Sequence, residues 1–433
     1  MQKKQEPKPG DYVEVHLGKT IYEGNLLEAP EDEKGIVLLK LDSGYNIGLN
    51  KRDIVEIKLI EKLKESGDWI KSSQEPKTID SKKPNIAMIM TGGTIASRYD
   101  SKTGGTHPLS SPSDFFKFYP ELFEMVNVVK VEVPFMKWSE AMDYKDWQKI
   151  AKIVEGFLND SDIKGIIMTQ GTDTLHYTSA ALSFFLGKVN KPVVLTYSQR
   201  SSDRASSDAN LNLKCSALAA ISDIAEVMIV GHASSNDDFC YAMPGAKVRK
   251  LHSSRRDAFK VVNGKPLAKI YPDKIEILKE HNIRNSLKVK TDTKFEEKIA
   301  LLKFYPGQDP EILDYYVEQG YKGIIIEASG LGNVPALTSN NSWIPTLKRI
   351  VAKDFFVGIT TQCIYGRVDP YVYSNLRTLN DTGIVFLGDM LSETAFVKLG
   401  WVLGHDDWAK DKNIVKEKML HNFVGEISER LEE

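Results

Sequence analysis

Threonines next to paired glycines are the residues of this chain whose types best suit nucleophilic catalysis. The motif TGGTIA stands at residues 91–96. Glycines such as Gly93 let the backbone turn sharply and bring its N–H groups close to a ligand. A threonine hydroxyl beside such donors can act as a nucleophile next to an oxyanion site, which makes Thr94 a candidate. Glycine-rich turns of this kind also bind phosphate, or only turn the chain, so that interpretation stays open.

A second threonine motif, TQGTDT, stands at residues 169–174. Thr172 and Asp173 fall where a helix is expected to begin, and either residue can cap that helix. The functional alternative is that Asp173 holds a substrate ammonium while Thr172 activates a water or relays a proton. The helix dipole and nearby N–H donors favour the charged form of a carboxyl group at this place, so Asp173 is expected to be ionised.

A third candidate is Lys250, which lies in the sequence VRKLHSS at residues 248–254. A lysine surrounded by other cations is ordinarily part of a solvated face. If Lys250 lies near Thr172, it can act instead as a base, provided that burial or the neighbouring cations lower its pKa from the usual ~10.4. The surrounding cations are Lys247, Arg249, Arg255 and Arg256.

Buried strands alternating with helices are expected to position these motifs. Short apolar runs occur at residues 86–90, 165–168, 192–196 and 226–230, and segments of helical spacing at 144–158, 174–186 and 207–224. This alternation predicts a parallel sheet covered on both faces. Each threonine motif directly follows a predicted strand, and ligands bind at the carboxyl ends of strands in such sheets.

A second alternation begins near Lys298. Apolar runs at residues 298–304, 323–330, 355–360 and 383–389 alternate with helical segments, and a last helix is expected at 392–403 with Ser392 and Glu393 as its N-cap signal. The polar segment 274–297 is expected to join the two lobes.

Residues 11–57 carry five short runs of strand-like character separated by turn-prone clusters. They predict a small β-barrel, followed by a polar, lysine-rich linker. The expected domains are a barrel at 1–60, a linker at 61–84, a large α/β domain at 85–285 and a smaller α/β domain at 290–433.

Composition excludes several classes of protein. The 433 residues carry 57 basic and 59 acidic side chains, so the formal charge is 57 − 59 = −2, which supplies no net attraction to nucleic acid. The three cysteines are too scattered for a disulfide framework and are each expected to be small buried hydrophobes. No apolar run reaches the ~18 residues of a membrane span, and the first ten residues lack the apolar core of a signal peptide. We expect a cytoplasmic protein with no metal site.

Taken together, the two threonine motifs resemble those of the bacterial-type asparaginase family. The similarity extends to Lys250 and to the stretches GDMLSETA at residues 388–395 and VKL at 397–399, and it covers roughly residues 85–403. It implies an asparaginase-like two-domain parallel-sheet body, here preceded by a small SH3-like β-barrel.

The resemblance also implies a role for each matching residue. Thr94 corresponds to the nucleophile, while Thr172, Asp173 and Lys250 correspond to a second catalytic set in which Asp173 also holds the substrate's α-ammonium group. Ser139 and Glu140 stand where the family binds the substrate α-carboxylate and α-ammonium, respectively. Without the family, Glu140 reads as a surface acid in front of a helix. Gly93 and Gly171 are expected to contact the substrate.

Two departures from the family pattern are visible. The family places a tyrosine in the loop after the first motif, whereas here Tyr99 lies too close to Thr94 and His107 lies nearer the expected place. Leu331 replaces an asparagine that commonly completes the site of the neighbouring protomer in family homodimers. No role is assigned to Tyr99 or His107, and completion across a dimer is in doubt.

The barrel, the linker and the run QRSSDR at residues 199–204 resemble one branch of the family, the D subunits of the archaeal glutamyl-tRNA(Gln) amidotransferases. That resemblance implies hydrolysis of glutamine or asparagine to supply ammonia to a different chain, the E subunit. The E subunit would use ATP and Mg²⁺ to convert Glu-tRNA(Gln) to Gln-tRNA(Gln). The two subunits would form a heterotetramer built on a homodimer of this chain. This chain itself is expected to need no cofactor. The alternatives are a stand-alone asparaginase or glutaminase and a non-catalytic tRNA-binding or assembly scaffold.

Overall fold

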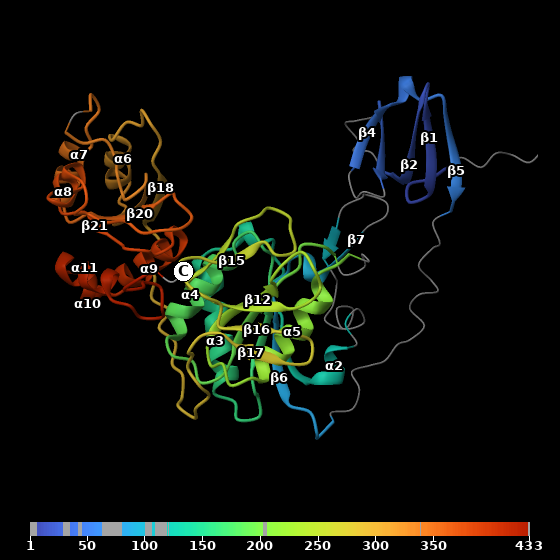
Figure 1. Cartoon of the computed structure of the whole chain (residues 1–433), viewed down its shortest axis with the longest axis horizontal. Helices are drawn as coiled ribbons and strands as arrows, with labels where there is room; N and C mark the ends of the chain where they lie inside the picture. The colour runs from blue at the N-terminus through green and yellow to red at the C-terminus, as the bar shows by residue number, and fades with distance from the viewer. Residues whose placement is uncertain are drawn as a thin grey trace, which may run out of the picture. The chain divides into compact units, whose positions relative to one another are not determined.

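The computed structural model describes residues 7–28, 35–41, 46–62, 80–99, 106–108, 119, 121–201, 206–337 and 339–431. Two compact units are present. One comprises residues 1–78, 96–119 and 201–207, and the other comprises 79–95, 120–200 and 208–433. The linker expected at 61–84 lies mostly outside the described residues. Both α/β lobes expected from the sequence belong to the second unit (Figure 1).

The N-terminal part of the first unit is a five-stranded antiparallel sheet, as the five apolar runs predicted. Its strand order is β4-β3-β2-β1-β5. Alternate residues of β1 point inward, so Val13 and Val15 are fully buried together with Leu39 of β3. The bounds are β1 (Tyr12–Leu17), β2 (Thr20–Leu27), β3 (Ile36–Leu41), β4 (Asn46–Asn50), η1 (Lys51–Asp53) and β5 (Glu56–Glu61). Another antiparallel pair in this unit joins β7 (Ser97–Tyr99) to β8 (Thr106–Pro108).

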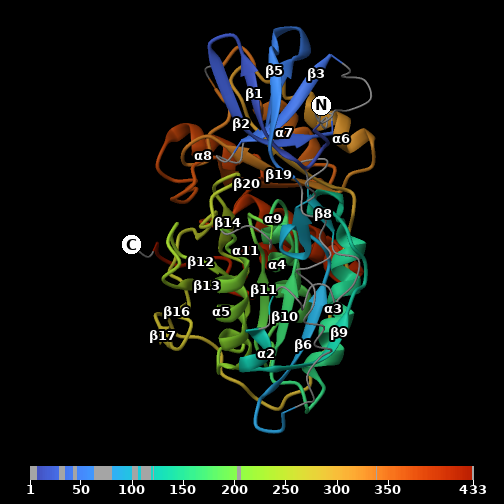
Figure 2. The same cartoon turned by 90° about the vertical axis from the view of Figure 1, so that its right-hand side faces the viewer.

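The large lobe of the second unit is built on an eight-stranded sheet of order β17-β16-β13-β12-β11-β10-β6-β9 (Figure 2). The five strands from β9 to β12 in this order are parallel, as predicted. The other three are antiparallel, which the sequence did not reveal. The bounds are β6 (Asn85–Met90), β9 (Asn127–Glu132), β10 (Ile166–Thr169), β11 (Val193–Thr196), β12 (Val227–His232), β13 (Cys240–Pro244), β16 (Ala268–Ile270) and β17 (Ile275–Ile277).

Helices cover both faces of this sheet. Helices α3 (Tyr144–Leu158) and α4 (Leu175–Leu186) share one apolar core with alternate residues of β6, β10 and β11. Helix α5 (Ala209–Ile221) contacts β10, β11 and β12, and its buried residues lie outside that core, so it covers the opposite face. Two further pieces complete the lobe, the short helix α2 (Leu122–Met125) and the antiparallel pair β14 (Val248–Lys250) and β15 (Phe259–Val261).

The small lobe has a parallel sheet of order β18-β19-β20-β21. Helix α9 (Ser392–Leu403) packs against α4 of the large lobe and against β18, β19 and β20, so the two lobes share a core. The remaining bounds are β18 (Ile299–Lys303), α6 (Ile312–Glu318), β19 (Gly323–Ala328), α7 (Ile344–Val351), β20 (Phe356–Thr361), α8 (Ser374–Asn380), β21 (Val385–Phe386), α10 (Asp406–Ala409) and α11 (Lys412–Leu420). The α/β body predicted from the sequence is confirmed.

Three local expectations are wrong. The segment 274–297 is not only a connector, because residues 275–277 form the edge strand β17. The N-cap of α9 is Leu391 rather than Ser392, whose hydroxyl hydrogen-bonds Thr360 at 2.8 Å. Cys363 is exposed, whereas Cys215 and Cys240 are buried as expected.

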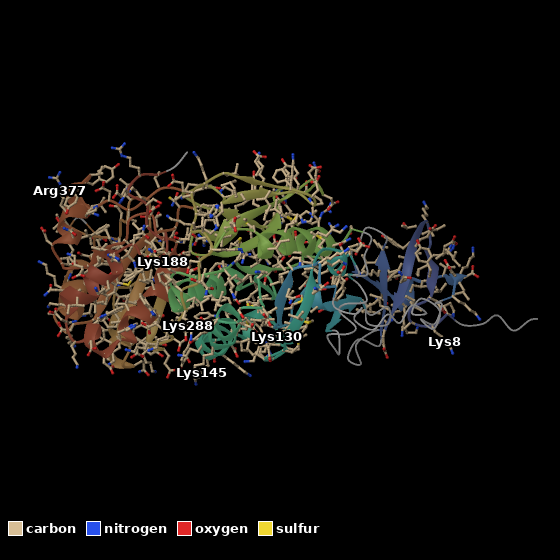
Figure 3. All side chains as sticks on the ribbon, turned by 90° about the horizontal axis from the view of Figure 1, so that it is seen from below. Lys8, Lys130, Lys145, Lys188, Lys288 and Arg377 are labelled. Atoms are coloured by element: carbon tan, nitrogen blue, oxygen red, sulfur yellow. The ribbon has the colours of Figure 1, made fainter. Side chains whose placement is uncertain are left out.

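Charged side chains of the second unit point outward from its ribbons, with nitrogen and oxygen tips interspersed (Figure 3). Lys130, labelled there, pairs with Asp160 at 2.5 Å. Basic and acidic side chains are therefore mixed on the surface that this view shows.

Candidate active site

The first threonine motif follows β6 and packs against the second motif. The backbone N–H and the hydroxyl of Thr91 both donate to the carbonyl of Thr169, at 3.1 and 2.9 Å. Gly93 has φ = 87°, and a Cβ added there would lie 2.3 Å from the backbone nitrogen of Gly171. Only glycine permits this approach. The next residue, half-buried Thr94, therefore begins the 3₁₀ turn η2 (Thr94–Ala96) directly beside the second motif.

The second motif follows the neighbouring strand β10, and its Thr172 and Asp173 do not cap a helix. Helix α4 begins at Leu175, and its N-cap is Thr174 without a side-chain cap bond. Thr172 and Asp173 instead lie in a turn before the helix, where Leu175 N–H reaches the Thr172 carbonyl at 3.5 Å. The capping interpretation is wrong, so both side chains are available for other contacts.

Lys250 joins both of these side chains from the end of β14. Its Nζ donates to Thr172 Oγ1 at 2.8 Å and to Asp173 Oδ1 at 2.7 Å. The Lys250 side chain is only 10% exposed, whereas that of Asp173 is 64% exposed. The solvated-face interpretation of Lys250 is therefore wrong. Because an ammonium only donates, Thr172 accepts from Lys250 and keeps its own hydroxyl proton for another acceptor.

Ser139 is buried against the second motif from the turn η3 (Ser139–Ala141). Its Oγ accepts the Asp173 N–H at 3.1 Å, and its carbonyl accepts the Thr174 hydroxyl at 2.6 Å. A Cβ on Gly171 would lie 3.0 Å from Ser139 Oγ, so this glycine allows close packing too. Glu140 follows Ser139 and is exposed.

The structure brings Ser139, Thr172, Asp173 and Lys250 into direct contact and sets Gly93 with Thr94 against them. The side chains of Tyr99 and His107, for which no role was assigned, lie outside the described residues. Leu331 is half-buried.

The cations around Lys250 do not share one environment. Arg249 Nε donates to Glu393 Oε1 at 2.9 Å, and Lys247 Nζ donates to Asp389 Oδ2 at 2.5 Å. Both acids are buried residues of the small lobe. Only Arg255, with its side chain 55% exposed, fits the solvated face that the sequence suggested.

Sequence reasoning missed the buried polar groups that lie near Arg249 and Lys250. Burial raises the pKa of Glu393, although Arg249 opposes that shift. His176 lies 3.9 Å from Glu393, and burial, followed by the charges of Arg249 and Lys250, lowers its pKa to about 3. Burial also raises the pKa of Tyr177. The one signal for Glu393 in the sequence is its place at the polar start of helix 392–403, which by itself indicates a helix N-cap.

The loop containing QRSSDR begins where β11 ends, and residues 202–205 of it lie outside the described part. The carboxylate of Asp208 accepts the N–H groups of Gln199 and Arg200 at 3.0 and 3.1 Å. Burial raises the pKa of Asp208, and these N–H groups oppose the shift. This buried carboxylate therefore fixes the loop's first residues rather than capping its own helix α5.

Among the described residues, no cluster of three or more histidine, cysteine, aspartate or glutamate side chains could hold a metal ion. The described helices also include none that is long and apolar enough to cross a membrane. The side chains that meet in the candidate site carry hydroxyl, carboxylate and ammonium groups.

Comparison with protein families matches three consecutive parts of the chain. Residues 7–60 match the family described as GatD N-terminal domain, residues 85–283 match Asparaginase, N-terminal, and residues 298–416 match Glutaminase/Asparaginase C-terminal domain. The chain is 45% identical over 427 residues to the D subunit of glutamyl-tRNA(Gln) amidotransferase from Pyrococcus furiosus, covering 97% of this chain and 94% of that protein. It is 46% identical over 413 residues to the corresponding D subunit from Thermococcus kodakarensis, covering 94% and 90%.

Solved structures of L-asparaginases are similar to the α/β body. The thermostable L-asparaginase from Thermococcus kodakarensis is 28% identical with a TM-score of 0.70, and the match covers 80% of this chain and all of that one. L-asparaginase I from Vibrio cholerae is 26% identical with a TM-score of 0.67, covering 80% of this chain and 99% of that one.

Proposed function

This chain belongs to the family of glutamyl-tRNA(Gln) amidotransferase D subunits, and from that premise we propose how its threonines release ammonia for the amidation of Glu-tRNA(Gln). It is a glutaminase-type amidohydrolase component of a tRNA-dependent amidotransferase. One observation carries the mechanism: Lys250, 78 residues after Thr172 in the chain, places its Nζ on both Thr172 Oγ1 and Asp173 Oδ1.

In the proposed reaction, Thr94 Oγ attacks the side-chain amide carbon of glutamine or asparagine. Backbone N–H groups of the glycine turns, including Gly93 and Gly171, stabilise the oxyanion, and one such donor is often worth ~10²–10³ in rate. The C–N bond then breaks, and the proton of the Thr94 hydroxyl leaves with the amide nitrogen as ammonia. Thr172, whose hydroxyl oxygen accepts a hydrogen bond from Lys250 and is oriented by it, guides a water that hydrolyses the resulting ester and restores Thr94.

The amino-acid end of the substrate is held by the polar groups beside the second motif. Asp173 offers an exposed carboxylate to the α-ammonium, and Glu140 is the second acid on that side. Ser139 Oγ already accepts the Asp173 N–H, so its own proton is available to the α-carboxylate. Because it pairs both charged groups at the α-carbon, such a site favours free α-amino acids. The amide itself is selected by the reaction at Thr94.

The ammonia is consumed by a different chain of the complex. We assign the use of ATP and Mg²⁺, and the activation of tRNA-bound glutamate, to this partner, the E subunit. The chain described here would then need no cofactor of its own. We place its activity in the cytoplasm. A homodimer of this chain within a heterotetramer is the assembly we expect. The N-terminal sheet is assigned to docking of the partner, because the L-asparaginases similar to the body match only 80% of this chain.

Ammonia release from glutamine and from asparagine tests this proposal. It is measured for the protein alone, with the E subunit, and with the E subunit plus Glu-tRNA(Gln). Activity that rises with each addition, and falls at least ~10³-fold in Thr94→Ala, is the expected result. Full activity that ignores both additions identifies a stand-alone amidohydrolase instead. Unchanged Gln-tRNA(Gln) formation in Thr94→Ala, with glutamine as nitrogen source, identifies a non-catalytic scaffold.

A further inference from the structure

The strand that carries Lys250 is very short and depends on other elements for its position. β14 has three residues, and its one strand partner is β15, with Lys250 opposite Phe259. Flanking backbone bonds extend the pair by one residue at each end, from Val262 N–H to the Lys247 carbonyl and from Leu251 N–H to the Ala258 carbonyl. A two-stranded ribbon alone is marginally stable, so further contacts must hold Lys250 within hydrogen-bonding distance of Thr172.

Those contacts lie on the face of β14 opposite Lys250. Side chains alternate between the two faces of a strand, so Val248 and Lys250 face one way while Lys247 and Arg249 face the other. Arg249 Nε donates to Glu393 Oε1 at 2.9 Å, and Arg249 Nη2 lies 3.8 Å from Glu327. Cations on the back of the strand therefore engage acids of the small lobe, while Lys250 engages the catalytic set on the front.

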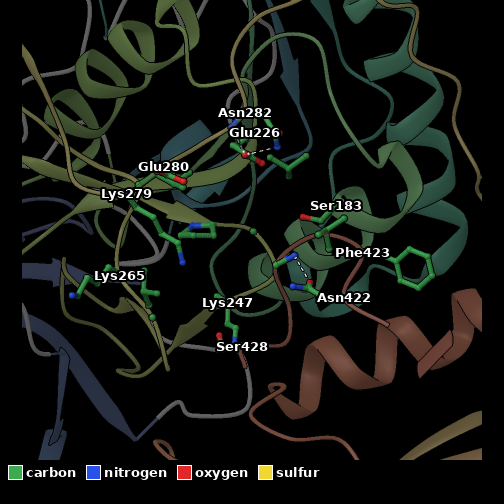
Figure 4. Close-up of a pocket in the computed structure, with 18 of the residues that line it drawn as sticks. Ser183, Glu226, Lys247, Lys265, Lys279, Glu280, Asn282, Asn422, Phe423 and Ser428 are labelled. Atoms are coloured by element: carbon green, nitrogen blue, oxygen red, sulfur yellow. Dashed lines mark hydrogen bonds between the residues drawn. The ribbon is translucent and has the colours of Figure 1, made fainter. Parts of the chain in front are cut away.

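A second ion pair fixes the other end of β14. Lys247 Nζ donates to Asp389 Oδ2 at 2.5 Å, and Asp389 Oδ1 accepts the N–H of Ser428 at 2.8 Å. Figure 4 shows Lys247 and Ser428 beside each other on the wall of a cavity of ≈270 Å³. Neither Thr94 nor Thr172 lines that cavity. This pair therefore approaches β14 from the side away from the catalytic residues.

Helix α9 supplies a firm base for these contacts. Glu393 is its second residue, and the hydroxyl of its third residue, Thr394, donates to the Ala246 carbonyl at 3.0 Å. Val397 and Leu399 of the same helix are fully buried in the core shared by the two lobes. Because core packing fixes α9, any displacement of β14 would break its buried polar contacts with this helix.

We propose that Arg249, held by Glu393, is a positioning residue for catalytic Lys250, so that the small lobe of the same chain sets the lysine's distance to Thr172. This inference rests on the proposed function, in which Lys250 serves the Thr94 and Thr172 reaction. Arg249 itself touches neither Thr172 nor Asp173 in the contacts of the described residues.

Glu393 and Glu327, the two acids near Arg249, are buried, so loss of their pairing with Arg249 is expected to be costly. Glu393 is 7% exposed and Glu327 8% exposed. Removing one partner of such a pair leaves a buried polar group without compensation and removes the contact that holds β14 against the small lobe. A displacement of about 1 Å at a catalytic group can cost roughly 100-fold in rate. Arg249→Met is accordingly expected to lower kcat about 10- to 100-fold while KM changes less than about threefold.

The experiment compares Arg249→Met, Arg249→Lys, Glu393→Gln and the double variant Arg249→Met/Glu393→Gln in the full-length protein together with the ATP-using partner. Arg349→Met is the control, because Arg349 also pairs with a carboxylate, Asp314, but this pair is more exposed and joins helices α7 and α6 away from β14. We expect kcat to fall in Arg249→Met and in Glu393→Gln, and to fall no further in the double variant. Arg249→Lys should recover part of the lost kcat. Arg349→Met should keep the full kcat.

A second measurement does not depend on activity. The amine of Lys250 is bonded and mostly buried, so labelling by an amine-reactive reagent, quantified by mass spectrometry of the Lys250 peptide, is expected to be slow in the native protein. It should rise several-fold in Arg249→Met and Glu393→Gln and stay unchanged in Arg349→Met, with melting temperatures measured in parallel. Native labelling and unchanged kcat in folded Arg249→Met or folded Glu393→Gln overturn the proposal.

Lys250→Met and Thr94→Ala separate this inference from the proposed function. If both variants keep ammonia release, the proposed function itself fails. If both lose it while the Arg249 and Glu393 variants keep full kcat, only the positioning role is refuted.

Discussion

At the scale of single residues, close approach between two turns decides where the proposed nucleophile, Thr94, lies. Thr94 follows a glycine whose Cβ position is occupied by the backbone of the neighbouring motif. The same closeness lets Thr172 and Asp173 share one lysine from β14. Small residues and backbone contacts, rather than long side chains, therefore bring the two threonine motifs together.

Gly93→Ala tests this close approach. The new Cβ would lie 2.3 Å from Gly171 N at φ = 87°, so the turn must move and displace Thr94. We expect ammonia release to fall at least about 100-fold. Gly187→Ala is the control, because Gly187 also has positive φ, at 58°, but has nothing within 4 Å of the added Cβ. It should lose about 1–3 kcal/mol of stability, because φ = 58° with ψ = −131° is a conformation that residues with a side chain disfavour, and it should keep its activity. Equal activities in the two variants would show that the approach is unimportant.

His176 is expected to make the body sensitive to acid. Its pKa in the folded protein is about 3 against an ordinary 6.5, because it is buried and close to Arg249 and Lys250. As the pH falls below 6.5 the unfolded chain binds this proton and the folded chain does not, so stability is lost until about pH 3. Between pH 6.5 and 4.5 the loss amounts to about 2–3 kcal/mol.

Denaturant unfolding of His176→Phe across this pH range measures that contribution. The phenylalanine ring can occupy the same place between Tyr177 and Phe259 but cannot titrate. The variant should therefore lose less stability between pH 6.5 and 4.5 than the unaltered protein. His421→Phe, at an exposed ring, should behave like the unaltered protein, and an identical acid response in all three would refute the assignment.

At the scale of elements, helix starts serve the site and the junction between lobes rather than their own helices. Thr172 and Asp173 precede α4 without capping it, and the polar start of α9 binds Ala246 and Arg249 of the large lobe. At its middle, α9 holds the C-terminal segment through Lys398. The Lys398 Nζ donates to Glu426 at 2.6 Å and to the carbonyls of Met419 and His421.

Lys398→Met is expected to be strongly destabilising. Lys398 and Glu426 both have fully buried side chains, and burial lowers the pKa of Lys398 while Glu426 opposes that shift. Removal of the lysine leaves a buried carboxylate unpaired and costs about 3–5 kcal/mol. Lys398→Met/Glu426→Gln should recover part of this stability. Lys412→Met, which removes an exposed pair with Asp354, should change the unfolding midpoint much less, and a similar loss in both would contradict the prediction.

At the scale of the whole molecule, the chain joins an amidohydrolase body to an N-terminal antiparallel sheet with its own small core. Val13, Val15 and Leu39 are buried within that sheet, and the four residues proposed to be catalytic, together with Ser139, all belong to the other unit. The L-asparaginase from Thermococcus kodakarensis is matched over its whole length by 80% of this chain. The body therefore has the size of an enzyme that folds independently.

Deletion of residues 1–62 should leave basal ammonia release within about threefold of the full chain, because the body retains its own core. Stimulation by the E subunit and Glu-tRNA(Gln) should be lost, because we assign partner docking to the N-terminal sheet. Ammonia assays with and without the E subunit measure both effects. Full stimulation of the truncated chain would remove the docking role, and loss of basal activity with retained folding would tie the sheet to the chemistry.

The sequence by itself determined the five N-terminal strands, the alternation of parallel strands and helices in both lobes, and the two threonine motifs, because hydrophobic periodicity and glycine spacing are local properties of the chain. The five N-terminal strands and helix 392–403 follow directly from it. Only weak or non-local signals failed: β17 has mostly exposed residues, so its pairing with β16 left no apolar run to detect.

Only the tertiary structure decided which polar residues meet. Lys247, Arg249 and Lys250 are close together in the sequence, and nothing local separates a solvated lysine from one bonded to Thr172. Their different fates follow from alternation along β14 and from acids that stand well over one hundred residues later, at Asp389 and Glu393. Long-range packing assigns those partners, because a buried charge must find its counterion wherever the fold brings one close.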